Sequence, residues 1–241
     1  MNMRRLEGKV ALVTGANRGI GRGIAEAFAA EGAALTLMAR DAALLNETAE
    51  ALKQNGADVL AIPADVTDER QVQEVFRQAM DRFKRLDILV NNAGTFEGYG
   101  PIDELPVESW DKVIAVNLRG PFLCTREAFR IMKQQGDGRI INIGSIASQR
   151  VRPHSASYST TKHGLWGLTQ VTALEGRDHG ISCGVLNPGN VRVEKRAGDP
   201  EPMMNVEDIA QAAVAMAALP PRVNMLEATV LVIDQPFLGR G

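Results

Sequence analysis

The feature that most constrains the fold is an alternation of short apolar runs with longer stretches of helical spacing. Apolar runs at residues 10–14, 35–39, 59–62 and 86–91 are each followed by such a stretch. The unit recurs at roughly thirty residues, as expected for strands joined through helices. Such strands run parallel, and helices cover both faces of their sheet. The alternation therefore predicts a doubly wound α/β fold.

Three further apolar runs extend the predicted parallel sheet to about seven strands. They lie at residues 139–143, 181–186 and 229–233. No linker rich in proline or serine and no internal repeat divides the 241 residues. This length suffices for one well-filled α/β domain. We therefore expect a single domain over residues 1–241.

The first predicted strand runs into a glycine-rich turn, Gly15-Ala-Asn-Arg-Gly19-Ile-Gly21, and a helical pattern follows to about Ala30. Glycines let the backbone approach a pyrophosphate, and a helix N-terminus offers N–H groups and a positive dipole. Strand, turn and helix in this order favour a Rossmann-like dinucleotide-binding domain. A plain strand-to-helix turn remains the alternative at this point, because the motif alone is only moderately specific.

Arg40 directly follows the second predicted strand. An acid at this position binds a ribose 2′-hydroxyl, whereas an arginine suits a 2′-phosphate. We therefore expect NADP(H) as the cofactor. Asp41 leaves NAD(H) open, because its carboxylate could turn toward the ribose. As the first residue of the next helix, it is better placed to face that helix's N-terminus.

A hydroxyl, a phenol and an ammonium lie close together in the sequence at Ser145, Tyr158 and Lys162. In a helix starting near residue 156, Tyr158 and Lys162 share one face, one turn apart. An ammonium there favours the phenolate and lowers a tyrosine pKa from about 10, which suits acid/base catalysis. Ser145 ends a predicted strand, where ligands bind in open α/β sheets. The alternative is a chance pair on a solvated helix.

Charge and composition exclude several other classes of function. The net charge is −2 with acids and bases interleaved, which gives no basic field for nucleic acid. No apolar run is long enough for a membrane, and no signal sequence follows the first residues, so we expect a cytoplasmic protein. Cys124 and Cys183 are expected to be unpaired core residues. The three histidines lack ligand spacing, so no metal site is expected.

The remaining segments predict loops and helices around this sheet. Residues 95–106 should form a loop, and a helix should continue to about residue 135, locally distorted at Asn117. Residues 190–205 carry charges and prolines and are expected to form a substrate lid. Asp68 should cap one helix, and Asn205 with Asp208 should cap the last.

Taken together, these motifs resemble those of the short-chain dehydrogenase/reductase family, in its compact form. The resemblance covers nearly the whole chain, and so many motifs in the right order are very specific. It rests on Thr14-Gly15-x-x-x-Gly19-x-Gly21, Asp65-Val66, Asn91-Asn92-Ala93-Gly94, Asn117, Ser145, Tyr158-x-x-x-Lys162 and Pro188-Gly189.

The resemblance implies a role for each catalytic residue. Tyr158 would be the general acid/base, and Ser145 would orient the substrate carbonyl oxygen. Lys162 would hold the nicotinamide ribose and tune Tyr158. Asn117 would anchor a water that connects Lys162 to solvent. The reaction would be hydride transfer between the nicotinamide and a carbonyl or secondary alcohol.

The resemblance also implies how the cofactor is held. The three glycines of the turn would cradle the pyrophosphate, and Arg18 would reach the 2′-phosphate beside Arg40. Asp65 would accept from the adenine amino group, and Asn91 with its neighbours would support the adenosine ribose and the central strand. The implied cofactor-binding residues are Gly15, Asn17, Arg18, Gly19, Ile20, Gly21, Arg40, Asp65, Val66, Asn91, Ala93, Gly94, Tyr158, Lys162, Pro188, Gly189 and Val191.

The sequence departs from the family pattern in three places. The residues after Pro188-Gly189 end in Val193, without the hydroxyl that often binds the nicotinamide carboxamide, so backbone groups of residues 189–193 would have to serve. The segment proposed as a lid is short. Gln235 stands where the family often has glycine.

Two classes of function follow from the resemblance. The first is an active NADP(H)-dependent carbonyl reductase or alcohol dehydrogenase. The second is a cofactor-binding regulatory or scaffold protein with weak catalysis. In either case the resemblance implies a homo-oligomer, a tetramer or dimer, with helices around residues 117–135 and 156–176 in one interface. Phe237 and Leu238 of the tail are expected at or near another.

Overall fold

The computed structural model describes residues 4–193 and 201–237. Its centre is one seven-stranded sheet in the order β3-β2-β1-β4-β5-β6-β7, and every neighbouring pair is parallel. This confirms the predicted Rossmann-like α/β fold. The strands are β1 (Val10–Thr14), β2 (Ala34–Ala39), β3 (Val59–Pro63), β4 (Ile88–Asn91), β5 (Gly138–Ile143), β6 (Ile181–Pro188) and β7 (Glu227–Val230).

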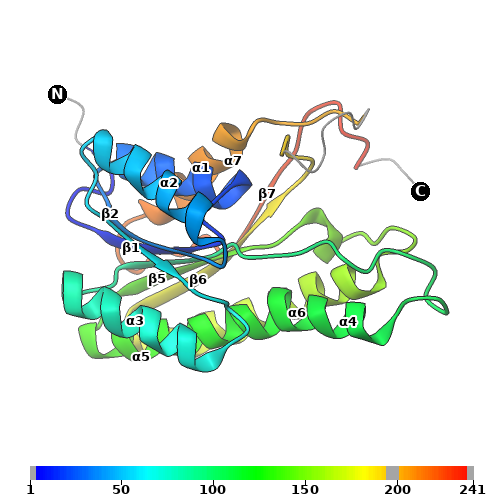
Figure 1. Cartoon of the computed structure of the whole chain (residues 1–241), viewed down its shortest axis with the longest axis horizontal. Helices are drawn as coiled ribbons and strands as arrows, with labels where there is room; N and C mark the ends of the chain where they lie inside the picture. Colours follow the sequence, from blue (N-terminus) through cyan, green and yellow to red (C-terminus); the bar gives the residue numbers. More distant parts are fainter. Residues whose placement is uncertain (1–3, 194–200, 238–241) are drawn as a thin grey trace.

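Helices cover both faces of the sheet (Figure 1). One layer holds α1 (Gly19–Ala30), α2 (Ala42–Gln54) and α7 (Val206–Ala217). The other holds α3 (Glu69–Phe83), α4 (Val107–Ile114), α5 (Gly120–Gln135) and α6 (Ala156–Gly176).

Burial on both faces explains why the inner strands are continuous apolar runs rather than alternating ones. All five residues of β1 are buried, as are the last five of β2. One hydrophobic cluster joins the sheet to α1, α2 and α7, and the second joins it to α3 and α5. Both cysteines lie in such positions, unpaired, and burial raises the pKa of each thiol to about 12.

The predicted helix caps are present. The Asp41 carboxylate accepts the Leu44 N–H at 3.1 Å, and the Asp68 carboxylate accepts the Arg70 N–H at 2.9 Å. At α7 the Asn205 N–H donates to the Asp208 carboxylate at 2.9 Å. Each carboxylate satisfies an otherwise unpaired backbone donor and faces the positive end of its helix dipole.

The distortion expected at Asn117 is also found. Ala115–Arg119 form one π-helical turn, η1, between α4 and α5. An inserted π turn rotates the following helix relative to the preceding one, and such turns are frequent at functional sites.

The last predicted strand was misplaced. The sequence indicated residues 229–233, but β7 covers Glu227–Val230 and Ile233 is 98% exposed. After β7 the chain turns back, because the Gln235 N–H donates to Val232 O at 2.9 Å. This turn places the Gln235 side-chain oxygen 2.9 Å from Asn190 N, whose N–H it accepts. The apolar residues 231–233 therefore lead into the turn and do not lie in a strand.

The described end of the tail packs against its own chain. Phe237 packs against Arg150 of the same chain, whose guanidinium lies 5.0 Å from the ring centroid, while Leu238 lies outside the described residues.

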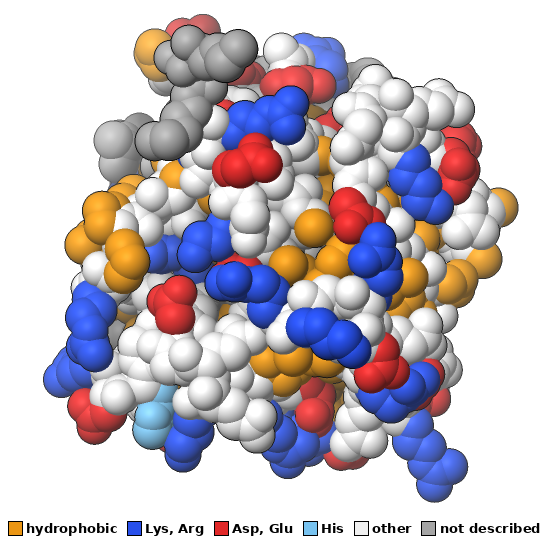
Figure 2. All heavy atoms as spheres, turned by 90° about the vertical axis from the view of Figure 1, so that its left-hand side faces the viewer, with side chains coloured by type: hydrophobic (Ala, Val, Ile, Leu, Met, Phe, Trp, Pro, Cys, Tyr) orange, Lys and Arg blue, Asp and Glu red, His pale blue; other side chains and the backbone are white. Residues whose placement is uncertain are grey.

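On the face drawn in Figure 2, basic and acidic side chains are interspersed. In the part of the chain that the structure describes, no helix has the length and apolar content to cross a membrane.

Candidate active site

The candidate site lies at the carboxyl edge of the sheet. The loops that follow β4, β5 and β6 gather there with the start of α6, on the right-hand side of Figure 1. Parallel strands all end at the same edge, so residues distant in sequence meet there. The predicted lid falls partly in this region: residues 190–193 and 201–205 are described, and 194–200 lie outside the described residues.

Tyr158 and Lys162 lie one turn apart on the buried face of α6. Each residue is 7% exposed, and the Lys162 ammonium is 5.6 Å from the centroid of the Tyr158 ring. Lys162 Nζ also donates to Ile143 O at 2.8 Å. This bond joins α6 to the end of β5, two residues before Ser145. The chance pair on a solvated helix is therefore excluded.

Burial lowers the pKa of Lys162 to about 8, because the charged form is poorly solvated inside the protein. The cation is thus the costly form in the unliganded protein. Any negative charge arriving nearby would favour the ammonium.

Ser145 follows β5 and begins a short 3₁₀ turn, Ile146–Ser148. Its hydroxyl oxygen accepts the Ala147 N–H at 3.1 Å, and its carbonyl accepts the Ser148 hydroxyl at 2.6 Å. The half-buried hydroxyl keeps its own proton for another acceptor.

Asn117 lies in the π turn and is 1% exposed. Its side-chain oxygen accepts the Thr95 N–H at 2.8 Å, and its amide donates to Thr95 O at 2.9 Å. The same amide lies 3.5 Å from the Thr161 hydroxyl on α6. Asn117 therefore ties the loop after β4 to the π turn and to α6.

Two aromatic residues of the loop after β4 lie against Tyr158. Sequence reasoning indicated residues 95–103 as a candidate wall of the substrate site but did not predict these contacts. Phe96 stacks on the Tyr158 ring with centroids 4.9 Å apart, and the Tyr99 centroid is 6.3 Å away. Both side chains are about half exposed, 54% and 51%. They place an apolar surface beside the phenol.

The glycine turn packs against the loop after β4. A Cβ on Gly15 would come within 2.9 Å of Ala93 Cα, and one on Gly21 within 2.3 Å of Gly15 O. Gly15 also has φ +65°, a conformation that favours glycine. Asn92 connects the two segments, donating to Thr14 O at 2.9 Å and to Gly15 O at 3.2 Å. Our sequence reasoning missed this role, although Asn92 lies within the motif.

The start of α1 suits a phosphate. Its N-cap residue, Arg18, makes no side-chain hydrogen bond to the helix, and no acid lies in the first turn. No side chain of the cap or of the first turn therefore accepts from the first N–H groups, and the Arg18 side chain is exposed. Asn17 accepts the Thr48 hydroxyl through its carbonyl at 3.5 Å, and Ile20 packs on the core.

Arg40 and Asp65 meet at the ends of β2 and β3. Arg40 Nη1 is 3.8 Å from one Asp65 carboxylate oxygen. The other Asp65 oxygen accepts the N–H and hydroxyl of Thr67 at 2.9 and 2.8 Å. The Arg40 side chain is 64% exposed and thus accessible to a ligand.

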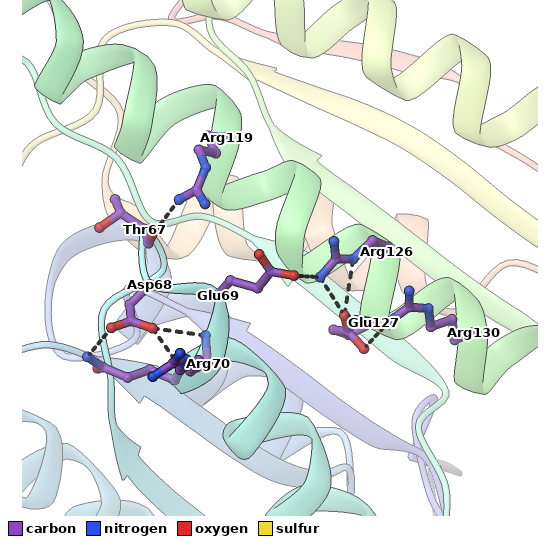
Figure 3. A network of polar contacts seen from close by, with 9 residues as sticks. Thr67, Asp68, Glu69, Arg70, Arg119, Arg126, Glu127 and Arg130 are labelled. Atoms are coloured by element: carbon purple, nitrogen blue, oxygen red, sulfur yellow. Dashed lines mark hydrogen bonds and ion pairs between the residues drawn. The ribbon is translucent and has the colours of Figure 1, made fainter.

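A polar network holds the segment after Asp65-Val66 in place (Figure 3). Arg119 of the π turn donates to Thr67 O, and Arg126 of α5 pairs with Glu69 at 2.6 Å. The Arg126 guanidinium holds the pKa of the Glu69 carboxyl below its usual value. Val66 itself is buried against Gly120, where a Cβ would lie 2.9 Å from Val66 Cγ2.

The Asn91 side chain lies in the interior, in keeping with its expected support of the central strand. Its amide donates to Thr125 Oγ1 at 3.0 Å and to Asn142 Oδ1 at 2.8 Å, and the residue is 3% exposed. The side chain supports the central strands, because strand alternation turns it into the helix layer.

The loop after β6 lies against the glycine turn. Val193 Cγ1 is 3.4 Å from where a Cβ on Gly19 would lie, and Val191 is buried in a bridge with Met204. Gly189 has no room for a side chain, since its Cβ would lie 2.2 Å from Gln235 Oε1. The departure at Gln235 thus packs under the Pro188-Gly189 turn.

Comparison with known proteins gives a consistent result. A model of the short chain dehydrogenase family matches residues 9–202. An uncharacterized oxidoreductase of Bacillus subtilis is 44% identical over 183 residues, covering 76% of this chain and 71% of that protein. The levodione reductase of Leifsonia aquatica is 34% identical over 251 residues, covering 95% and 94%.

A solved structure agrees with these sequence matches. A short-chain dehydrogenase/reductase of Serratia marcescens, determined as a double mutant, has 35% sequence identity and a TM-score of 0.88 to this chain. The match covers 94% of this chain and 98% of the other.

Proposed function

The chain belongs to the short-chain dehydrogenase family, and from this premise we propose that it transfers a hydride between NADP(H) and a small-molecule carbonyl or secondary alcohol. The observation that carries the proposal is the grouping of the buried Tyr158 and Lys162 with the half-buried Ser145. Lys162 bonds to the strand end that presents Ser145 and lies beside the Tyr158 ring. Three groups able to handle one proton and one carbonyl oxygen therefore meet at one edge of the sheet.

The described residues fit a dinucleotide. The positions of Gly15 and Gly21 have no room for a side chain, and the start of α1 has no side-chain cap. These residues would hold the pyrophosphate, Asp65 and Val66 the adenine, and Lys162 with the turn at Pro188-Gly189 the nicotinamide half. When bound, NADP(H) supplies or accepts the hydride.

Tyr158 is proposed to donate the proton to the carbonyl oxygen in reduction and to remove it in oxidation. Ser145 would donate a hydrogen bond to the same oxygen, because a carbonyl oxygen can only accept, while the Ser145 hydroxyl oxygen accepts the Ala147 N–H. Lys162 would stabilise the phenolate through its charge. Phe96 excludes water from one face of the Tyr158 ring.

The preference for NADP(H) rests on Arg40 and Arg18. Arg40 is exposed at the end of β2, and Asp41 is occupied as the cap of α2. Because the Asp41 carboxylate already accepts the Leu44 N–H, the alternative in which Asp41 binds the ribose is less well supported. Guanidinium groups bind a 2′-phosphate through charge-assisted hydrogen bonds that a 2′-hydroxyl cannot match.

The proposal also includes a homo-oligomer, a dimer or tetramer. Exposed apolar side chains lie on the outer surfaces of α5 and α6, at Phe122, Val171 and Leu174. Apolar surface of this kind is typical of an interface with another protein chain.

The experiment measures NADPH oxidation across a panel of ketones and aldehydes for the wild type and Tyr158→Phe. Removing the proton donor should lower kcat by ~10²–10⁴-fold while leaving NADPH binding intact. Tyr99→Phe is the matched comparison, because it removes the other tyrosine hydroxyl of the chain. A Tyr158→Phe protein with more than about a tenth of the wild-type rate contradicts the assignment. NADPH binding without turnover would instead favour the regulatory or scaffold alternative.

A further inference from the structure

Asn187, the residue of β6 that precedes Pro188-Gly189, is fully buried, and its side chain contacts Ser145. Its side-chain oxygen accepts the Ser145 N–H at 3.1 Å and lies 3.2 Å from the Ser148 hydroxyl. The backbone pairing of β5 with β6 ends with the Gly144 N–H donating to Leu186 O at 2.8 Å. Asn187 thus extends the ladder by one side-chain bond, and that bond goes to Ser145.

The orientation of the Asn187 amide is fixed from its other end. Asn187 Nδ2 donates to Glu227 Oε1 on β7 at 2.9 Å. Gln149, from the turn after Ser145, donates to the same carboxylate oxygen. A carboxylate can only accept hydrogen bonds, so the amide nitrogen must face Glu227 and the amide oxygen must face Ser145.

The residue before Ser145 leaves room for this arrangement. A Cβ on Gly144 would lie 2.1 Å from Asn187 Oδ1, too close for the two to coexist unchanged. Gly144 has no positive φ, so backbone conformation does not require a glycine there. Close contacts with Asn187 and with Val185, whose Cγ2 would lie 2.7 Å from such a Cβ, account for it.

We propose that Asn187 is a positioning residue for Ser145, held in its acceptor orientation by Glu227. This rests on the proposed function, in which the Ser145 hydroxyl binds the substrate oxygen. Asn187 fixes the Ser145 backbone, and the Ala147 N–H fixes the hydroxyl oxygen. Displacement of a reacting group by about 1 Å can cost ~10²-fold in rate. Asn187 on β6 and Glu227 on β7 thereby set the position of Ser145.

A double-mutant cycle with Ser145 tests the proposal. Asn187→Leu should lower kcat by ~10- to 100-fold with NADPH affinity unchanged. In a Ser145→Ala background the same substitution should cost less than about twofold, because its route to the substrate is gone. A merely structural role would lower the rate equally in both backgrounds, and that result overturns the proposal. Asn224→Leu, which removes a side-chain bond to Cys183 O of the same strand, is the control.

A second pair of variants reverses the polarity of the contact. Asn187→Asp retains an acceptor for the Ser145 N–H but faces Glu227 with a like charge, so kcat should fall. Adding Glu227→Gln supplies a donor to the new carboxylate and should restore at least half of the lost rate, on a logarithmic scale. No recovery in the double variant would contradict the assigned orientation.

A third measurement is independent of turnover. Hydrogen exchange of the Ser145 amide should be faster in Asn187→Leu than in the wild type, while the Ile143 amide inside β5 is unchanged. An unchanged Ser145 amide overturns the proposal whether or not the enzyme turns over. A wild type that binds NADPH but reduces no carbonyl counts against the proposed function alone.

Discussion

At the scale of single residues, Lys162 shows how position creates chemistry. An exposed lysine titrates near pH 10.4, but here burial brings the pKa to about 8. Within the described residues, its ammonium donates a hydrogen bond to Ile143 O. Keeping the Lys162 ammonium charged next to Tyr158 therefore lowers the free energy of unfolding.

That cost predicts a pH dependence of the free energy of unfolding. The pKa of Lys162 is about 8 when folded against an ordinary 10.5, so the unfolded chain binds more protons between these values. The contribution of Lys162 to the free energy of unfolding should therefore rise with pH from about 8 to about 10.5, by up to ~1.4 kcal/mol per pH unit, and be flat below pH 8. The buried thiols of Cys124 and Cys183, with pKa raised to about 12, act in the opposite direction above about pH 9, so the Lys162 contribution is the difference between the wild type and a Lys162 variant.

Chemical denaturation of the cofactor-free protein at pH 7, 8, 9 and 10 measures this effect. Lys162→Met should lack this rise, whereas Lys53→Met, which removes an exposed lysine on α2, should retain it. Parallel curves for wild type and Lys162→Met would contradict the prediction.

Arg40 carries the second prediction at this scale. Replacing Arg40 by Asp removes the guanidinium and brings a carboxylate toward Asp65 and any 2′-phosphate. With ~1.5–3 kcal/mol for each charge-assisted bond, the kcat/KM ratio for NADPH over NADH should fall roughly 10- to 150-fold.

Steady-state kinetics with both cofactors measures the ratio. Arg177→Asp makes the same charge change just before β6, at the opposite edge of the sheet, and should leave the ratio unchanged. A wild type that prefers NADH, or an Arg40→Asp protein with an unaltered ratio, would refute our interpretation of the end of β2.

The sequence was sufficient to find Tyr158, Lys162 and Ser145, because their spacing within one segment carries the signal. It did not indicate the contacts of Phe96, Asn92 and Asn187, each of which meets a segment that is distant in the sequence. Asn92 bonds to the start of the glycine turn, Phe96 stacks on Tyr158 of α6, and Asn187 accepts the Ser145 N–H after β5. Such pairs become neighbours only once the strand order is known.

At the scale of elements, the π turn before α5 determines where Asn117 points. In a regular α-helix the Asn117 side-chain amide would compete with the backbone for hydrogen bonds. Here it bonds to both the backbone N–H and the backbone C=O of Thr95. The sequence predicted a distortion at this position without predicting its partner. The partner depends on the path of the loop after β4, which propensity does not encode.

Asn117→Ala should loosen that loop. Losing two buried bonds at ~1 kcal/mol each should speed exchange of the Thr95 amide by roughly 10- to 30-fold. Hydrogen exchange with peptide resolution measures this over residues 93–100, with the buried strand β1 as the internal control. Equal exchange in wild type and variant would show that the loop is held by other contacts.

Element boundaries were predicted best where a cap or a buried strand defined them. Asp41 and Asp68 marked the starts of α2 and α3 correctly. The predicted position of the edge strand β7 was shifted, because among the described residues no strand pairs with its outer side and its pattern is only partly apolar. Pairing with β6, rather than local hydrophobicity, decides where it ends.

At the scale of the whole molecule, alternation alone was enough to predict the sheet and both helix layers. What alternation does not specify is which surfaces meet another copy of the chain. Phe237, expected at an interface, packs on Arg150 of its own chain, which reduces the need for a partner there. The exposed apolar residues of α5 and α6 remain the better candidates.

We therefore expect light scattering to give the mass of a dimer or tetramer. Val171→Asp, at an exposed position of α6, should lower that mass, because a buried unpaired charge disfavours association. Leu44→Asp, on α2 in the opposite layer, should not. A wild type that is monomeric at micromolar concentration would contradict the expectation.

The two buried cysteines have a practical consequence. With both thiols inside the core and their pKa near 12, neither offers a reactive thiolate to maleimide reagents at neutral pH. A cysteine introduced at Ile102, which is 81% exposed in the loop after β4, would then be the one labelled position. A fluorophore attached there would report on this loop as ligands bind, without removing a native residue from the core.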